Sequence, residues 1–195
     1  MVSPQKQEKR MVIREAATRL FAEKGFENTT TRDIARAAKI SNAALYYYFD
    51  SKEELLYEIL EETMNSGLKK IMAIETSGQD LKEQLSSILK VHAATTVDYN
   101  KMKLLVHDQK SLSPEHEEAL IGNQRTYVRM LVEIFKKLQK KGKMADLDPT
   151  ACAFAFFGMV SWSYRWYDPK GKITPEHLSR IFEHIFTRGI FSGSL

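Results

Sequence analysis

The sequence contains a single cysteine, Cys152, among 195 residues. One thiol cannot form an internal disulfide, so a disulfide-stabilised scaffold is excluded and a reducing, cytoplasmic compartment is favoured. Long apolar runs are also missing, because no stretch approaches the roughly 18 residues that a membrane-spanning helix needs. The opening MVSPQKQEKR is charged and lacks the apolar core of a secretory signal. We therefore expect a cytoplasmic protein with no membrane association.

The common catalytic and metal-binding signatures are missing as well. Neither a GxGxxG nor a GxxxxGKS/T phosphate loop occurs, and the five histidines are scattered without HExxH spacing. His177 and His184 are seven residues apart and have no adjacent cluster of carboxylates. Cys152 lies in an apolar segment with no neighbouring base, which favours a buried thiol over a nucleophile. We expect no enzyme activity, no catalytic residue, no cofactor and no metal.

What is present is helical periodicity. Hydrophobic residues make up 43% of the chain and charged residues 28%, as in ordinary globular proteins. Apolar positions recur at helical spacing, whereas no segment shows the alternation of a strand, and there are no internal repeats. The pattern predicts an all-α fold of about nine helices, at residues 6–24, 31–39, 43–49, 51–76, 79–96, 100–109, 115–141, 150–167 and 175–190.

The positive charge is concentrated at one end. Residues 1–52 contain ten Lys or Arg and six Asp or Glu, and the remaining chain contains 19 of each. A basic head on a neutral body favours an anionic partner, nucleic acid first, although so small an excess also arises by chance. The lysines between 136 and 143 favour a solvated helix end over a second nucleic-acid patch.

Residues 30–52, TTRDIARAAKISNAALYYYFDSK, have the pattern of a helix-turn-helix. Ile34, Ala37 and Ala38 form an apolar stripe, and Thr30 or Thr31 is placed to cap the first helix. Ile40, Ser41 and Asn42 interrupt the pattern before a second short helix that carries three successive tyrosines. Hydroxyl groups beside basic side chains suit contacts to phosphate.

The stretch LFAEKGFENTTTRDIARAAKISNAALYYYFDSKEELL resembles the tetracycline-repressor (TetR) family of bacterial regulators. The matching positions are Leu20, Phe21, Gly25, Phe26, Thr31, Ile34, Ala35, Leu45, Tyr46, Phe49, Lys52 and Leu55. Tyr48 departs from the family pattern, which very often has His there. The resemblance implies an all-helical homodimer whose two heads bind successive major grooves of a palindromic double-stranded operator, with a DNA-binding domain at 1–52 and a ligand-binding and dimerisation domain at 53–195.

The resemblance also implies roles for individual residues of the head. Thr31 would bind a phosphate, and Arg32 would reach a base or the backbone. The residues expected to face the groove are Ser41, Asn42, Ala43 and Ala44, and those expected to fix register on the phosphates are Tyr46, Tyr47, Tyr48 and Lys52. We expect Leu45 and Phe49 to pack in the core of the head.

The last two helices of the family normally form a four-helix dimer interface, for which we select Phe154, Gly158, Phe182, Ile185, Phe186 and Gly189. The segment WSYRWYDP at 162–169 resembles regulators of fatty-acid or sterol degradation that respond to acyl-CoA thioesters. Trp162, Arg165 and Trp166 are spaced i, i+3 and i+4, so on a continuous helix two indoles and a guanidinium would share one face. A stacked Trp–Arg pair at the interface edge is the alternative.

The other groups that we expect to line an effector pocket with Met159 are His92, Tyr99, Met102, His107 and Arg125. The predicted function is a transcriptional regulator, a repressor in preference to an activator, released from its operator by an acyl-CoA, a fatty acid or a related amphiphile. The alternative is a DNA-binding factor of the nucleoid-occlusion type, which acts through a protein partner without a ligand.

Overall fold

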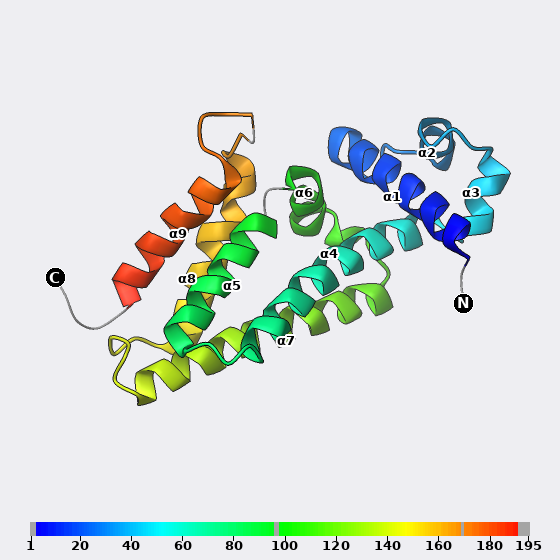
Figure 1. Ribbon diagram of the computed structural model, residues 1–195. Helices are drawn as coiled ribbons and strands as arrows, with labels where there is room; N and C mark the ends of the chain where they lie inside the picture. The colour runs from blue at the N-terminus through cyan, green and yellow to red at the C-terminus, as the bar shows by residue number, and fades with distance from the viewer. Residues whose placement is uncertain (1–2, 96–97, 169, 191–195) are drawn as a thin grey trace. The chain divides into compact units, whose positions relative to one another are not determined.

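The computed structural model describes residues 3–95, 98–168 and 170–190. The described chain consists of nine α-helices without a strand, which confirms the predicted all-α class. The helices are α1 (Pro4–Lys24), α2 (Thr31–Ala37), α3 (Asn42–Tyr48), α4 (Lys52–Glu75), α5 (Leu81–Thr95), α6 (Tyr99–His107), α7 (Pro114–Lys140), α8 (Pro149–Ser161) and α9 (Pro175–Ile190) (Figure 1). Two short 3-10 turns follow α6 and α8, at Gln109–Ser111 and Trp162–Arg165.

Side-chain caps set the helix starts in the head. The Thr30 hydroxyl accepts from the Asp33 N–H at 3.2 Å, and the Asp33 carboxylate accepts from the Thr30 N–H at the same distance. The start of α4 is capped differently: the Glu54 N–H donates to the Ser51 hydroxyl at 2.9 Å, and the Glu54 carboxylate accepts from the Asp50 N–H, one residue earlier, at 2.7 Å. Both arrangements satisfy N–H groups that lack a partner within the helix.

The chain forms two compact units. Unit 1 contains residues 1–63 and 100–121, and unit 2 contains residues 64–99 and 122–195. Both α4 and α7 begin in unit 1 and continue into unit 2. The domain boundary at residue 52 stays a prediction, and the first turns of α4 belong to the same compact unit as the head.

Unit 1 is built around a small aromatic and aliphatic core. Phe21, Leu45 and Phe49 are buried, as are the inner residues of the first turns of α4. The Lys103 ammonium on α6 donates to the Ala22 carbonyl at 2.6 Å, which fastens α6 to α1. Burial of Leu45 and Phe49 agrees with the prediction that these two residues are core rather than surface.

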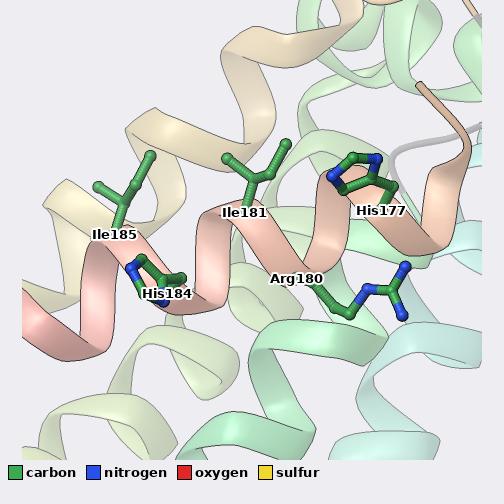
Figure 2. A pocket seen from close by; sticks show the side chains of 5 residues that line it. All are labelled: His177, Arg180, Ile181, His184 and Ile185. Carbon is green, nitrogen blue, oxygen red and sulfur yellow. The ribbon is translucent and has the colours of Figure 1, made fainter. Parts of the chain in front are cut away.

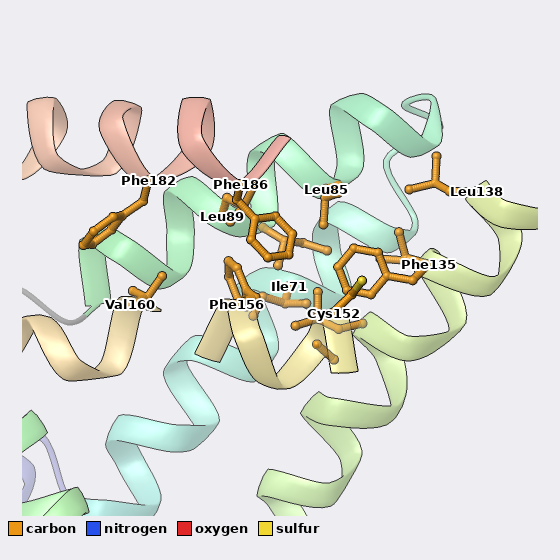
Figure 3. Close-up of a cluster of buried hydrophobic side chains, with 14 of the residues drawn as sticks. Ile71, Leu85, Leu89, Phe135, Leu138, Cys152, Phe156, Val160, Phe182 and Phe186 are labelled. Atoms are coloured by element: carbon orange, nitrogen blue, oxygen red, sulfur yellow. The ribbon is translucent and has the colours of Figure 1, made fainter. Parts of the chain in front are cut away.

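Unit 2 has a larger core, in which α9 packs against α5 and α8. Its buried side chains include Ile71, Leu85, Leu89, Phe135, Leu138, Cys152, Phe156, Val160, Phe182 and Phe186 (Figure 3). Burial raises the pKa of the Cys152 thiol, in agreement with a structural rather than nucleophilic cysteine.

Phe182 and Phe186 correct the predicted interface. Only 5% and 8% of their surfaces are exposed, and the Phe186 ring lies 5.5 Å from that of Phe156 and 5.9 Å from that of Phe135. Both side chains therefore fill the core of their own chain. On α8, by contrast, the predicted interface residues Phe154 and Gly158 are exposed, together with Ala155.

Candidate functional site

The turn between α2 and α3 contains a residue in the left-handed backbone conformation. Lys39 has a φ of 55°, its N–H donates to the Arg36 carbonyl at 3.2 Å, and the Ile40 N–H donates to the Ala35 carbonyl at 3.0 Å. These two bonds satisfy the last carbonyls of α2 and reverse the chain sharply. The turn sets the direction of α3, whose Leu45 is buried in the head.

The N-terminus of α3 presents small side chains. The Ser41 hydroxyl caps the helix by accepting from the Ala44 N–H at 3.0 Å, which leaves its own hydrogen available to donate. Ser41 and Ala43 are exposed, whereas Asn42 and Ala44 are half-buried. The Asn42 side-chain oxygen is buried and has no partner among the described residues. Of the four residues predicted to face a groove, Ser41 and Ala43 are therefore the most accessible.

The predicted phosphate ligands Thr31 and Tyr46 lie together. The Tyr46 hydroxyl is 3.4 Å from the Thr31 hydroxyl, although the two residues lie on different helices. Tyr46 is 48% exposed and Tyr47 is 68% exposed, values that are high for aromatic side chains in a folded domain. Thr31 is half-buried, and Arg32 is exposed beside it on α2.

Lys6 is a neighbour of this surface that sequence patterns did not reveal. Its ammonium lies 4.8 Å from the centre of the Tyr47 ring, and the Tyr47 ring meets the ring of half-buried Tyr48 edge-on at 5.1 Å. Lys6 precedes Tyr47 by 41 residues, so no local spacing links them. The pairing places a cation over the ring of an exposed tyrosine.

Lys52, which was predicted to contact a DNA phosphate, makes contacts within the head itself. Its ammonium donates to the Phe26 carbonyl at 2.8 Å and lies 4.1 Å from the centre of the Phe26 ring. The side chain thus ties the start of α4 to the loop after α1. An ammonium has three N–H donors, so one bond to Phe26 leaves others for a phosphate.

Arg10 fixes the other end of α3, and the sequence did not reveal it either. Its guanidinium donates to the Tyr48 carbonyl, pairs with the Glu58 carboxylate and stacks 4.2 Å from the centre of the Phe49 ring. Arg10 on α1 thus fastens the end of the tyrosine-bearing helix α3 and pairs with Glu58 on α4. Lys52 fastens α4 to the loop after α1.

In unit 2, the predicted ligand residue His92 lies in an aromatic cluster. Its Nδ1 is 2.9 Å from the Tyr127 hydroxyl, and its ring is 5.1 Å from Phe156 and 5.3 Å from Phe157. Burial lowers the pKa of His92 to about 4 and raises the pKa of Tyr127. Tyr127 was recognised in the sequence only as part of an apolar stripe.

The Trp162, Arg165 and Trp166 group does not have the predicted geometry. Helix α8 ends at Ser161, and Trp162–Arg165 is a 3-10 turn rather than a continuation of the α-helix. The Arg165 guanidinium lies 4.7 Å from the centre of the Trp162 ring. Trp166 instead meets the Phe182 ring edge-on at 6.3 Å. The predicted single face is therefore divided, with an exposed Trp162–Arg165 pair and a separate Trp166 contact.

The other predicted ligand residues do not gather in one place. Met102 and His107 belong to unit 1, where Met102 is buried and His107 exposed. Tyr99 and Arg125 belong to unit 2 and are exposed, and half-buried Met159 packs at the edge of the unit 2 core. Helical spacing alone cannot assign residues of different helices to one unit.

A shallow groove of about 340 Å³ runs along the outside of α9, lined by His177, Arg180, Ile181, His184 and Ile185 (Figure 2). Ile185, a predicted interface residue, is 58% exposed in it, and Gly189 is exposed one turn further on. Among the described residues, no three His, Cys, Asp or Glu side chains form a group that could hold a metal ion. None of the helices in the described segments is both long and apolar enough to cross a membrane.

Two family models match this chain. Residues 13–59 match the model described as bacterial regulatory proteins, tetR family, and residues 78–190 match the tetracyclin repressor-like C-terminal domain. The second match alone covers more than half of the chain. The protein belongs to the tetR family. The tetR-type head coincides with the helix-turn-helix described above, so the chain is a DNA-binding transcriptional regulator.

The tetR-family relatives include named repressors. The HTH-type transcriptional repressor KstR2 of Rhodococcus jostii is 31% identical over 195 residues, covering 94% of this chain and 92% of the relative. The structure of AibR in complex with isovaleryl coenzyme A and operator DNA is 27% identical, with a TM-score of 0.81 over 91% of this chain and 97% of that one. The structure of KstR2 from Mycobacterium tuberculosis, at 24% identity and a TM-score of 0.88 over 99% of this chain and 98% of that one, shows the shared fold.

Proposed function

We propose that this tetR-family protein is a cytoplasmic, homodimeric repressor that binds a palindromic operator and releases it when unit 2 binds an acyl-CoA thioester or a related amphiphile. The observation that carries the DNA-binding half is the surface of α2 and α3. There, the Thr31 and Tyr46 hydroxyls are adjacent, Tyr47 lies beside the Lys6 ammonium, and Ser41 and Ala43 are exposed.

The head divides naturally into positioning and reading groups. Hydroxyls and cations around α3 suit the phosphates, which fix register without reading sequence. The short Ser41 and Ala43 side chains at the start of α3 allow close approach to base edges, so contacts to thymine methyl groups and DNA shape carry the sequence preference.

Removing the Tyr47 hydroxyl tests this division. Tyr47→Phe keeps the ring and its contacts to Tyr48 and Lys6, and it should weaken binding to operator and unrelated duplex DNA by a similar factor of about 3 to 10. Fluorescence anisotropy at several salt concentrations measures both affinities, beginning with the DNA upstream of the protein's own gene. Tyr99→Phe, at an exposed tyrosine outside the head, is the matched control. Loss of operator binding alone would show that Tyr47 reads sequence.

The exposed Trp162–Arg165 pair supports an amphiphilic effector. A guanidinium stacked on an indole suits a phosphate or carboxylate, and an apolar chain fits beside the aromatic surface. The relationship to AibR, whose structure contains isovaleryl coenzyme A, also supports this class. Two members of the predicted ligand set, Met102 and His107, belong to unit 1 and do not contribute to this argument.

An acyl-CoA panel tests the effector class. Thioesters from 4 to 16 carbons are titrated into the protein–operator complex, and DNA release is followed by anisotropy. At least one chain length should release the DNA, and Arg165→Met should raise the required concentration about tenfold, as expected for loss of a charge-assisted contact. Arg129→Met, at another exposed arginine, is the control. Retention of DNA with every thioester would contradict this effector class and favour regulation through a protein partner.

Helix continuity supplies a route for the response. Because α4 and α7 each run from unit 2 into unit 1, a displacement caused by effector binding reaches the head along two helices. In a homodimer, this displacement would change the spacing of the two heads. Successive major grooves on one side of the duplex are about 34 Å apart, so altered spacing lowers the affinity for the operator.

A further inference from the structure

His92 has one satisfied and one unsatisfied nitrogen. Nδ1 lies 2.9 Å from the Tyr127 hydroxyl, whereas Nε2 is buried without a hydrogen-bond partner among the described residues. The ring sits among three aromatic side chains, with centroid distances of 5.1 to 5.3 Å to Phe156, Phe157 and Tyr127. Buried polar atoms in folded proteins are almost always paired, so the lone Nε2 requires an explanation.

Hydrogen bonding determines which nitrogen carries the proton. The contact between Nδ1 and the Tyr127 hydroxyl is compatible with either direction of donation. We infer that the phenol donates, because Nδ1 is the acceptor found for its hydrogen among the described residues, and this places the imidazole hydrogen on Nε2. Burial keeps the imidazole neutral at pH 7 and the phenol protonated. In this tautomer Nε2 is an N–H donor without an acceptor among the described residues, and a buried donor without an acceptor costs free energy.

We propose that the Nε2–H of His92 donates to an uncharged oxygen of the effector, such as a ketone or thioester carbonyl, while the effector's apolar part lies against half-buried Phe157. This inference rests on the proposed function, in which unit 2 binds a small-molecule effector. Tyr127 acts as a positioning residue, because its hydroxyl selects the tautomer of His92. It does not touch the effector oxygen in this arrangement.

The surroundings favour a neutral acceptor over a carboxylate. The imidazole is neutral and its ring neighbours are aromatic, so a buried carboxylate would lose its hydration without gaining a cation. The edge of the same core can adapt to a ligand, because Met130, Phe157 and Met159 are only partly buried against it. Methionine side chains repack easily around an apolar group.

A cycle of two proteins and two ligands isolates the carbonyl contact. The wild type and His92→Phe are each titrated by calorimetry with an acyl-CoA and with the S-alkyl-CoA of equal chain length, which lacks the carbonyl oxygen. The wild type should bind the thioester about tenfold more tightly than the thioether, and His92→Phe should bind both with similar affinity. An unchanged preference in His92→Phe overturns the inference.

Stability and nitrogen chemical shifts separate recognition from a structural role. His92→Phe is compared with the wild-type residue in a Tyr127→Phe background, where no tyrosine hydroxyl is left unpaired. There, a purely structural His92 predicts a lower melting temperature for the His92→Phe protein, whereas an unpaired Nε2–H predicts no loss. In protein labelled with 15N-histidine, wild-type His92 should show the Nε2–H tautomer, and Tyr127→Phe should give a tautomer mixture. His107→Phe, at an exposed histidine, is the control for the substitution itself.

Failure of the acyl-CoA proposal is distinguishable from failure of this inference. If the wild type binds neither CoA compound, the acyl-CoA class is wrong, and 2-decanone then tests His92 directly as an uncharged ketone. A ketone-induced shift of the His92 Nε2 signal, absent with decane, supports the inference. No shift overturns it.

Discussion

At the scale of single residues, the turn of the head depends on a lysine in a conformation that glycine usually adopts. Lys39 has a φ of 55°, where a side chain costs about 1 kcal/mol relative to glycine. The N–H groups of Lys39 and Ile40 nevertheless donate to carbonyls of the last turn of α2 and so terminate the helix. A cationic side chain at this exposed turn beside α3 favours a role in binding DNA over a role in stability.

Two substitutions at Lys39 separate charge from backbone strain. Both Lys39→Gly and Lys39→Ala remove the ammonium, but only glycine relieves the left-handed conformation, so the Gly variant should be more stable than the Ala variant by about 1 kcal/mol. Urea unfolding measures this difference. Both variants should lose DNA affinity equally, by about threefold at low salt. Equal stability of the two variants would show that the turn stores no strain.

At the scale of helices, a clasp fastens the starts of α4 and α7 within unit 1. The Glu53 carboxylate accepts from the Ser113 N–H at 2.8 Å and lies 2.9 Å from the Nδ1 of His116. The His116 ring stacks on Tyr57 at 3.9 Å, with an angle of 4° between the planes. One side chain of α4 thus holds both the capping region and the first turn of α7.

A double-mutant cycle measures the strength of the clasp. Glu53→Gln removes the charge, and His116→Phe keeps a ring to stack on Tyr57 but removes the hydrogen bond. Each change should cost about 1 kcal/mol of unfolding free energy, because the side chains are partly exposed and solvent weakens the pair. The double variant should cost less than the sum of the two. Strict additivity in urea unfolding would show that the two side chains act independently.

Helix starts were predictable from sequence because their signals are local. Thr30 with Asp33 and Ser51 with Glu54 are three residues apart, and each pair caps its helix in the structure. The end of α8 was not predictable in the same way. No glycine or proline lies between Ser161 and Asp168, so the apolar and aromatic pattern continued past the point where the helix tightens into a 3-10 turn.

Periodicity also could not show which apolar side chains of α9 are buried. Phe182, Phe186 and Ile185 are all apolar residues of α9, and only packing against α5 and α8 places the two phenylalanines inside. Contacts between residues far apart in the sequence could not be predicted for the same reason. The Lys52 bond to the Phe26 carbonyl and the position of Lys6 over Tyr47 join residues 26 and 41 positions apart, beyond any helical spacing.

At the scale of the whole molecule, the exposed apolar residues of unit 2 favour a second copy of the chain as partner. Phe154 and Ile185 are 59% and 58% exposed, and the small residues Gly158 and Gly189 are also exposed and permit close approach of helices. Phe154→Glu should weaken dimerisation by at least about 30-fold, because a buried charge would replace an apolar anchor.

Analytical ultracentrifugation measures this effect on the dimer, and operator affinity should fall with it. Met72→Glu is the matched control, since Met72 is 53% exposed on α4 and lies outside the proposed interface. A Phe154→Glu protein that remains dimeric would place the interface elsewhere. A monomeric Phe154→Glu protein that keeps full operator affinity would show that one head suffices.

The stability of the whole chain should depend on pH through His92. Burial lowers the pKa of this histidine from 6.5 to about 4, so the unfolded chain takes up a proton at a pH where the folded chain does not. The associated stability is complete above pH 6.5 and is lost as the pH falls towards 4. Between pH 7 and pH 5, the wild type should lose about 2 kcal/mol through this group.

His92→Phe isolates that contribution, because other groups titrate in both proteins. The raised pKa values of Glu58 and Asp108, which result mainly from burial, act in the opposite direction, since protonation of these carboxyls favours the folded chain. Urea unfolding at pH 7 and pH 5 should therefore show a loss that is about 2 kcal/mol smaller in His92→Phe than in the wild type. Equal losses would mean that the imidazole is hydrated in the folded protein. A hydrated Nε2–H would already have a water acceptor, and the structural reason for assigning it to a ligand would disappear.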